Sequence, residues 1–392
     1  MKHLSYLEGN HSTYLKLEMH KKFPGKKLYF MADYPRPGLL STPEFDFNSL
    51  GNLNDKLFFK IKPEHLEEIR NRKAFLVYES WIESGEIYIY WLYKKCIKAN
   101  IPPEQVILLG SSFDYNDICK KYAIENGVKP ITNVYYNFFE RHVKKHYDPE
   151  NDYDPLTNKL EKRYIYLNFT FRAHRRALLS MLHGSDLLKY GYVSYHNKAI
   201  ERNFDPVSFM LDYFDEPVRT LIEKGANISD SFPLKLDDII ITPTSINPVI
   251  PIIDYVRKSF LHVVGETFYG TADSWINTTP GSPNYMKDKN PECVFLTEKV
   301  FNCIHFKQPF IVLSYPNSLE AFKRLGYKTF DCIIDESYDK EMDDTKRLYK
   351  VYSEIKRICE LDESTLEEYR LRLAPILEHN FNIWMNKTNY MH

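Results

Sequence analysis

The sequence has few of the residues that mark several common classes of protein. It holds only six cysteines in 392 residues, and none of them forms a C-x-x-C pair or lies at zinc-site spacing. We therefore expect reduced, buried thiols and no disulfide framework. No apolar run approaches the roughly 18 residues that a membrane span needs, and the first residues lack the apolar core of a signal peptide. These absences predict a cytoplasmic protein without a membrane span.

An excess of one charge is also missing. The chain carries 52 Lys and Arg against 53 Asp and Glu, a net charge of −1, so it has no global basic field to drive non-specific nucleic-acid binding. The P-loop, G-x-G-x-x-G, G-x-S-x-G and H-E-x-x-H patterns do not occur. A D-x-D sequence, Asp152-Tyr153-Asp154, lies in an aperiodic stretch, and we assign no metal site to it.

What the sequence does contain is typical of a globular protein with two domains. Hydrophobic residues make up 43% of the chain and aromatic residues 15%, which is enough for well-packed cores. A length of 392 residues exceeds one ordinary core. Residues 146–159 are rich in Asp, Asn, Pro and Tyr and lack periodicity, so we expect a linker there. The predicted domains are 1–150 and 160–392.

Short apolar runs alternate with amphipathic stretches in both predicted domains, which indicates mostly parallel sheets covered by helices. In the first domain we expect strands at residues 27–32, 74–78 and 105–109, and helices at 86–99 and 114–126, the second closed by Gly127. In the second we expect strands at 163–167, 260–264, 310–313 and 329–334, a strand or a pocket edge at 237–242, and helices at 175–188, 344–361 and 364–384.

The segment 294–315 carries the most specific chemistry. A short apolar run ends in Thr297-Glu298-Lys299, and an amphipathic stretch follows. A helix that begins here has a carboxylate and an ammonium group side by side at its N-terminus. Helix N-termini attract phosphate, a lysine adds a full charge, and a glutamate accepts hydrogen bonds from sugar hydroxyls. These are the requirements of a nucleotide-sugar site.

The same segment resembles the donor-binding signature of GT-B glycosyltransferases related to the α1,3-fucosyltransferases. It is more similar still to a group of glycosyltransferase-like proteins of large phages and giant viruses. The resemblance rests on the TEK tripeptide, the strand 309–311, the run 325–330 and the acidic segment 335–339. It implies two Rossmann-like domains with the active site in the interdomain cleft, an inverting and metal-independent transfer, and no cofactor. If the protein is viral, its compartment is the host cytoplasm.

A cluster of arginines is the expected diphosphate site. Arg172, Arg175 and Arg176 follow the first strand of the second domain, where a βα loop faces the ligand, and guanidinium groups match phosphate oxygens. The resemblance assigns diphosphate binding to Arg172 and Arg175 together with Lys299. Positive charge at a helix N-terminus is unfavourable, so the cluster needs an anionic partner or a reason in the fold. The alternative is a solvated basic helix start.

Two glutamates are the expected sugar-binding residues. By the resemblance, Glu298 binds the ribose; otherwise it is a first-turn carboxylate favoured by the helix dipole. Glu266 follows a predicted buried strand, and we expect it either to reach the donor sugar or to serve the fold.

The catalytic base is expected in the N-terminal domain, at a strand end. Glu79 follows the strand 74–78 and is our first candidate, and Asp33 follows the strand 27–32 and is the second. Either is otherwise an ordinary loop carboxylate. The acceptor is a glycan or a hydroxymethylated base of phage DNA. The rival hypothesis is a catalytically inactive GT-B fold that acts as a carbohydrate- or nucleotide-binding module.

Overall fold

The structure is a computed structural model in which the chain forms two compact units. The first unit comprises Met1–Phe138, Pro291–Cys293 and Asn389–His392, and the second comprises Phe139–Asn290 and Val294–Thr388. This division precedes the predicted linker at 146–159. The structure describes residues 10–32, 61–79, 86–145, 147, 154–170, 172–198, 206–231, 234, 236, 249–267, 269–270 and 293–391.

A four-stranded parallel sheet forms the centre of the first unit. Its order is β1-β2-β3-β4, so each strand pairs with its neighbours in the sequence. The strands are β1 (Leu28–Ala32), β2 (Phe75–Glu79), β3 (Val106–Gly110) and β4 (Thr132–Tyr135). Within the described residues, the helices of this unit are α1 (Asn10–Lys22), α3 (Pro63–Arg70), α4 (Glu86–Lys98), η4 (Pro103–Gln105) and α5 (Tyr115–Asn126).

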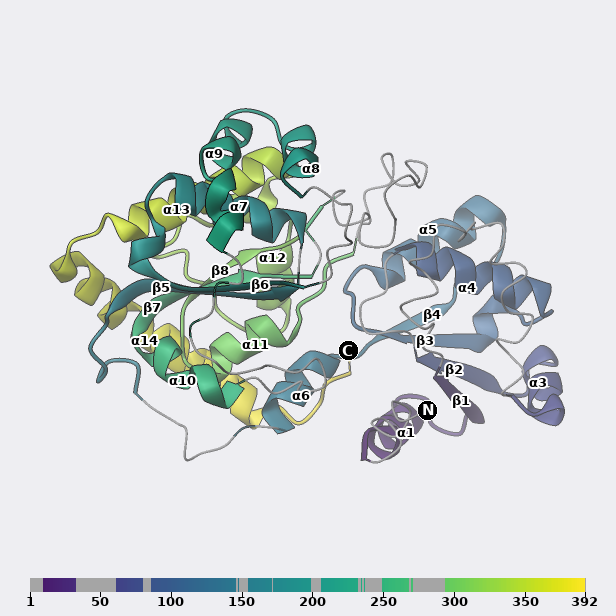
Figure 1. Ribbon diagram of the computed structural model, residues 1–392. Coiled ribbons are helices and arrows are strands. Elements are labelled where there is room, and N and C mark those ends of the chain that lie inside the picture. Colours follow the sequence, from purple (N-terminus) through teal and green to yellow (C-terminus); the bar gives the residue numbers. More distant parts are fainter. Residues whose placement is uncertain are drawn as a thin grey trace. The chain divides into compact units, whose positions relative to one another are not determined.

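Helices cover both faces of this first sheet. Figure 1 shows α4 and α5 on one side of it and α1 on the other. Leu15 and Met19 of α1 pack with Val77 and Ile107 of the sheet, and the C-terminal residue Met391 completes the cluster. Successive right-handed crossovers place their helices on one face, so segments from outside the β1–β4 series cover the opposite face. One of these segments is α1.

The second unit also contains a four-stranded parallel sheet, with the order β6-β5-β7-β8. The strands are β5 (Lys162–Thr170), β6 (Gly191–Lys198), β7 (Ser259–Gly265) and β8 (Phe310–Leu313). All seven residues of β7 and all four of β8 are buried. Continuous apolar runs of this kind are expected of parallel strands that helices cover on both faces.

The helices of the second unit lie on both sides of its sheet. They are α6 (Phe138–Lys145), α7 (Ala173–Gly184), η6 (Leu188–Tyr190), α8 (Pro206–Tyr213), α9 (Val218–Lys224), η7 (Ala226–Ser231), α10 (Val249–Arg257), α11 (Glu298–His305), α12 (Ser318–Arg324), η9 (Glu336–Lys340), α13 (Asp344–Cys359) and α14 (Glu363–Asn386). Figure 1 shows α7 and α13 on one side of the sheet and α10 and α11 on the other. The chain is therefore an α/β protein built on two parallel sheets. Among the described residues, no helix is long and apolar enough to cross a membrane.

Most of the predicted elements are confirmed. The strand at 310–313 has the predicted limits, and Gly127 closes α5 in the left-handed conformation, with φ of 63°. The strand or pocket edge predicted at 237–242 lies outside the described residues. The strand predicted at 329–334 is wrong, because this segment forms turns. Its backbone is bound by side chains instead of a neighbouring strand: Glu336 accepts from the Phe330 N–H at 2.7 Å, and Asn380 bonds both Lys328 backbone groups at 2.8 Å.

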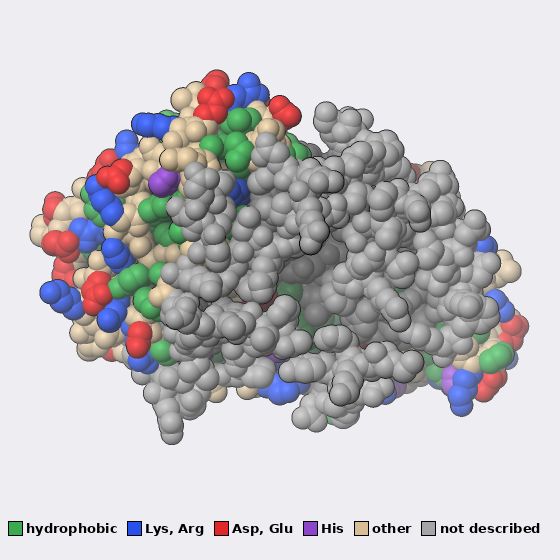
Figure 2. All heavy atoms as spheres, in the orientation of Figure 1, with side chains coloured by type: hydrophobic (Ala, Val, Ile, Leu, Met, Phe, Trp, Pro, Cys, Tyr) green, Lys and Arg blue, Asp and Glu red, His purple; other side chains and the backbone are tan. Residues whose placement is uncertain are grey.

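Charges of both signs are mixed on the surface. Figure 2 shows Lys and Arg side chains interspersed with Asp and Glu over the visible, described part of the second unit. Many are close pairs, such as Lys356 with Glu360 at 3.7 Å. On this face the two signs are therefore mixed and do not form two large opposed patches.

Candidate functional site

The strand order of the second sheet reverses direction at β5. This strand comes first in the sequence and lies between β6 and β7, so the chain leaves it toward one edge of the sheet and later returns toward the other. The helices α7 and α11 lie on opposite sides of the sheet as a result (Figure 1). In open α/β sheets, ligands bind outside the carboxyl ends of the strands at such a reversal.

The two central strands stop pairing before they end. The register between β5 and β7 finishes at Ile165 and His262. The pairing of β5 with β6 extends to Thr170, and that of β7 with β8 extends to Gly265. The last residues of β5 and β7 are thus held by their outer neighbours, which leaves their facing edges for other contacts.

Glu266 directly follows β7 and is the centre of a buried network. Its side chain is 1% exposed. One carboxylate oxygen accepts from the Thr297 N–H at 2.9 Å, and the other accepts from the Thr297 hydroxyl at 2.6 Å. The Lys299 ammonium lies 3.5 Å from the second oxygen and donates to the Thr297 hydroxyl at 2.8 Å. The Glu266 carboxylate therefore holds the start of α11 through several contacts together, to Thr297 and to Lys299.

Glu298 and Lys299 occupy the first turn of α11. They form an ion pair at 3.1 Å, and their side chains are 28% and 27% exposed. Burial alone would raise the pKa of the Glu298 carboxyl, but Lys299 and Arg175 lower it by more, so its pKa lies below the ordinary value. An ionised carboxylate and an ammonium group thus stand at a helix N-terminus, both within reach of solvent.

Arg175 and His174 approach the same point from α7. Both the Arg175 guanidinium and the His174 Nε2 contact the backbone carbonyl of Glu266, each at 2.9 Å. The His174 ring stacks on Tyr269 with centroids 5.0 Å apart. Arg175 is 5% exposed, so the alternative of a solvated basic helix start is wrong for this residue. The structural role of Arg175 is to donate to the backbone carbonyl of Glu266, which follows the end of β7.

The three predicted arginines lie near Tyr195 but have different surroundings. Arg172 is the half-buried N-cap residue of α7. Arg176 is fully buried, and its guanidinium donates to the Ala226 carbonyl of η7 at 3.3 Å. Burial lowers the pKa of Arg176 to about 10. Arg176 therefore packs α7 against η7, whereas Arg175 is the residue that meets the Glu266 network.

Sequence reasoning missed Arg347 and Tyr269, which hold this network in place from α13 and from the segment after β7. Arg347 of α13 is 1% exposed and donates to the backbone carbonyls of Tyr269, Ser314 and Glu341, and it pairs with Asp344. The Tyr269 hydroxyl donates to the Asp344 carbonyl at 2.6 Å. The only signal in the sequence is an Asp and an Arg three residues apart in a helix, which is far too common to identify such an anchor.

The two candidates for the catalytic base belong to the first unit. Glu79 is the last residue of β2 and is half-buried, in register with Ala32 and Leu109 on the neighbouring strands. Asp33 lies outside the described residues. Glu79 is thus at the carboxyl end of a central strand, as its position in the sequence predicts.

The acidic segment 335–339 serves the fold. Asp335 accepts from the Ser337 N–H at 2.9 Å, and Asp339 accepts from the Leu319 N–H at 2.9 Å. These carboxylates cap short helical turns. Across the described ranges, no three His, Cys, Asp or Glu side chains are grouped in a way that could hold a metal ion.

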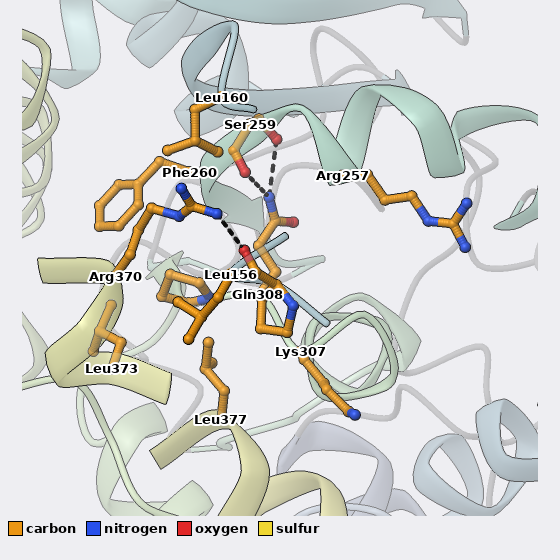
Figure 3. A pocket seen from close by; sticks show the side chains of 12 residues that line it. Leu156, Leu160, Arg257, Ser259, Phe260, Lys307, Gln308, Arg370, Leu373 and Leu377 are labelled. Atoms are coloured by element: carbon orange, nitrogen blue, oxygen red, sulfur yellow. Dashed lines mark hydrogen bonds between the residues drawn. The ribbon is translucent and has the colours of Figure 1, made fainter. Parts of the chain in front are cut away.

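A hollow lies at the opposite, amino-terminal edge of the second sheet (Figure 3). It measures about 370 Å³, including space open to solvent, and Ser259, Phe260 and Pro309 contribute to its lining. Gln308 donates to Ser259 there, and Arg370 donates to the carbonyls of the segment that begins the second sheet, at Pro155 (2.6 Å). The hollow therefore lies where that segment packs against the rest of the second unit. It is at the amino-terminal edge of the sheet, whereas α/β folds bind ligands at the carboxyl-terminal edge.

Comparisons with known proteins add little. No family model matches the sequence, and no curated protein matches it. Among solved structures, the N-terminal domain of trehalose-6-phosphate phosphatase from Candida albicans is similar with a TM-score of 0.38 and 10% identity. The match covers 96% of this chain and 74% of that one, and a likeness of this degree carries no argument about function.

Proposed function

We propose that this protein is a nucleotide-sugar-dependent glycosyltransferase whose second unit binds the donor. The observation that carries the proposal is the Glu266 network, which holds Glu298 and Lys299 at a helix N-terminus beside Arg175. This group lies at the reversal of strand order in a parallel sheet, where α/β folds bind nucleotides.

Each residue has a role in the proposed donor site. Lys299 and the half-buried Arg172 neutralise the diphosphate, and Arg175 sets the position of the adjoining backbone. Glu298 accepts hydrogen bonds from the ribose hydroxyls, which its ionised state favours. Glu266 has both oxygens engaged within the protein, so it positions Thr297 and Lys299 and does not contact the sugar.

The reaction is a displacement at the anomeric carbon. The acceptor oxygen forms a bond to that carbon, the bond to the phosphate oxygen breaks, and the nucleoside diphosphate leaves with the electron pair. The resemblance favours inversion without a metal ion, with Lys299 and Arg172 balancing the charge that develops on the leaving group. Glu79 or Asp33 takes the proton of the acceptor hydroxyl, which is a glycan hydroxyl or that of a hydroxymethylated base.

A panel of UDP-, GDP-, CMP- and dTDP-sugars in a thermal-shift assay tests the donor site. One class should raise the melting temperature, because a ligand that binds the folded state stabilises it. Lys299→Ala should weaken that binding by about 1.5–3 kcal/mol, the range for charge-assisted hydrogen bonds. The matched control is Lys356→Ala, an exposed lysine on α13 paired with Glu360, which should bind like the wild type.

Transfer must then be separated from binding. Release of the nucleotide, which is a nucleoside diphosphate or, from a CMP-sugar, CMP, in the presence of glycans or hydroxymethylcytosine DNA indicates an enzyme and names the acceptor class. Binding that Lys299→Ala abolishes, with no release under any condition, favours the inactive binding module. Binding to duplex DNA that falls steeply with salt selects the DNA acceptor.

A further inference from the structure

Asn168 lies on β5, opposite Tyr195 of β6, just before the irregularity that ends the strand. Its side chain is 4% exposed, and neither atom of its amide completes a hydrogen bond within the described ranges. The Tyr166 hydroxyl, on the same face of the strand, donates its proton to the Arg175 carbonyl at 3.0 Å. Its oxygen also interacts with the Asn168 amide, but the two groups do not reach hydrogen-bond geometry. The Asn168 Oδ1 is thus buried without a donor, and its Nδ2 has only the interaction with Tyr166.

The surroundings of this amide belong to the candidate site. A Cβ atom added at Gly265 would lie 3.2 Å from the Asn168 Oδ1 and 3.0 Å from the Arg175 Cγ. The Asn168 amide, the Arg175 side chain and the bare backbone of Gly265 therefore meet at the carboxyl ends of β5 and β7, one residue from Glu266. This is also where the two strands no longer pair with each other.

The two other amide residues of the second unit that are buried as whole residues, Asn380 and Gln308, are satisfied. Asn380, 2% exposed, accepts from the Lys328 N–H and donates to the Lys328 carbonyl, both at 2.8 Å. Gln308 donates to Ser259 and bonds His262. Burying an amide without partners is unfavourable, so native proteins rarely keep one unless water or a ligand completes it. Asn168 differs from these two amides, and it lies at the proposed ligand site.

We propose that Asn168 is a specificity-determining residue that binds the donor directly, an inference that rests on the proposed function. Its Nδ2 donates to a diphosphate oxygen beside Arg175, and its Oδ1 accepts from a hydroxyl of the adjoining sugar. The amide therefore recognises a sugar diphosphate that presents both groups side by side. Inorganic pyrophosphate offers only the first of the two contacts.

The test compares Asn168→Ala with Asn380→Ala in the full chain. The probes are inorganic pyrophosphate and whichever UDP-, GDP-, CMP- or dTDP-sugar stabilises the wild type most. Asn168→Ala should keep or raise the melting temperature, because it removes a buried polar group without partners. It should weaken binding of the nucleotide sugar about tenfold and binding of pyrophosphate only about threefold, which are the effects expected from losing one or two hydrogen bonds. Asn380→Ala should lower the melting temperature and leave both affinities within about twofold of the wild type.

Two results would overturn the inference. Wild-type affinity in Asn168→Ala means that the amide binds water or nothing. A fall in melting temperature like that of Asn380→Ala, with affinity retained, means that Asn168 serves the fold. If Lys299→Ala weakens binding in the same assay, the proposed function stands while this inference fails. If the wild type binds neither probe, both fail.

Discussion

Glu266 and Thr297 are joined by two hydrogen bonds, one from the threonine N–H at 2.9 Å and one from its hydroxyl at 2.6 Å. Thirty-one residues separate them in the chain. The bonds fasten the end of β7 to the start of α11, and Lys299 closes the arrangement at 3.5 Å. The position of Lys299, which we propose binds the diphosphate, thus depends on the buried carboxylate of Glu266.

Glu266→Gln should therefore destabilise the second unit. A glutamine still accepts one hydrogen bond, but its NH₂ cannot accept from the Thr297 hydroxyl, and Lys299 loses its buried counter-charge. Breaking a buried charge pair costs about 3–5 kcal/mol when no water replaces the lost partner; Lys299 is partly exposed, so we expect about 2 kcal/mol. Urea unfolding measures the change, and Glu341→Gln, which affects the more exposed pair with Lys350, is the control. Equal effects in the two variants would contradict the assigned role.

Glu298→Gln should show how much the nucleoside and the diphosphate each contribute to binding. If Glu298 binds ribose hydroxyls, the variant should bind the preferred nucleoside diphosphate about 5- to 20-fold more weakly and inorganic pyrophosphate almost unchanged. Lys299→Ala should weaken both ligands. Isothermal titration measures the two affinities for each variant. A parallel loss of both ligands in Glu298→Gln would show that this carboxylate acts only by orienting Lys299.

Gly225 should tolerate no side chain. A Cβ atom there would lie 1.8 Å from the Ser180 carbonyl oxygen, a backbone atom of α7 that cannot swing away. Gly225→Ala must therefore separate α7 from α9, and we expect a loss of about 2 kcal/mol or more in the free energy of unfolding. Gly127→Ala is the control: its φ of 63° is strained for alanine, but nothing lies within 4 Å, so about 1 kcal/mol is expected. Thermal unfolding ranks the two, and the reverse order would refute the close approach.

The sequence predicts the layered α/β organisation because buried parallel strands are continuous apolar runs, as in 260–264 and 310–313. The same rule fails at 329–334, where Phe330, Ile333 and Ile334 are buried in turns. Burial there is a property of the packed core, and the residues that bind the backbone, Glu336 and Asn380, are not recognisable from the local pattern. Short apolar runs alone cannot separate the two cases.

The candidate site was predictable only in part. The pattern places Arg175, Glu298 and Lys299 at helix starts after strands, and the structure brings them to one point around Glu266. It cannot distinguish Arg175 from Arg176, because adjacent helical residues point about 100° apart and only the neighbouring elements decide which faces the sheet end. It cannot identify Asn168, which lies against Gly265 about 100 residues later in the chain, or Arg347, which donates to Tyr269 about 80 residues earlier.

His262 should make the second unit sensitive to mild acid. It lies within β7, bonded to Gln308, and burial lowers its pKa from 6.5 to about 4. Well above pH 6.5 the imidazole is neutral in both the folded and unfolded chains, so it has no effect on stability. As the pH falls toward 4, His262 is protonated in the unfolded chain but stays neutral in the folded chain, so the free energy of unfolding decreases. Between pH 7 and pH 5 the loss should be about 2 kcal/mol. His262→Gln, which keeps an amide partner for Gln308 but does not titrate, should lose correspondingly less stability over this interval when urea midpoints are compared at the two pH values. An unchanged pH dependence in the variant would place the acid-sensitive group elsewhere.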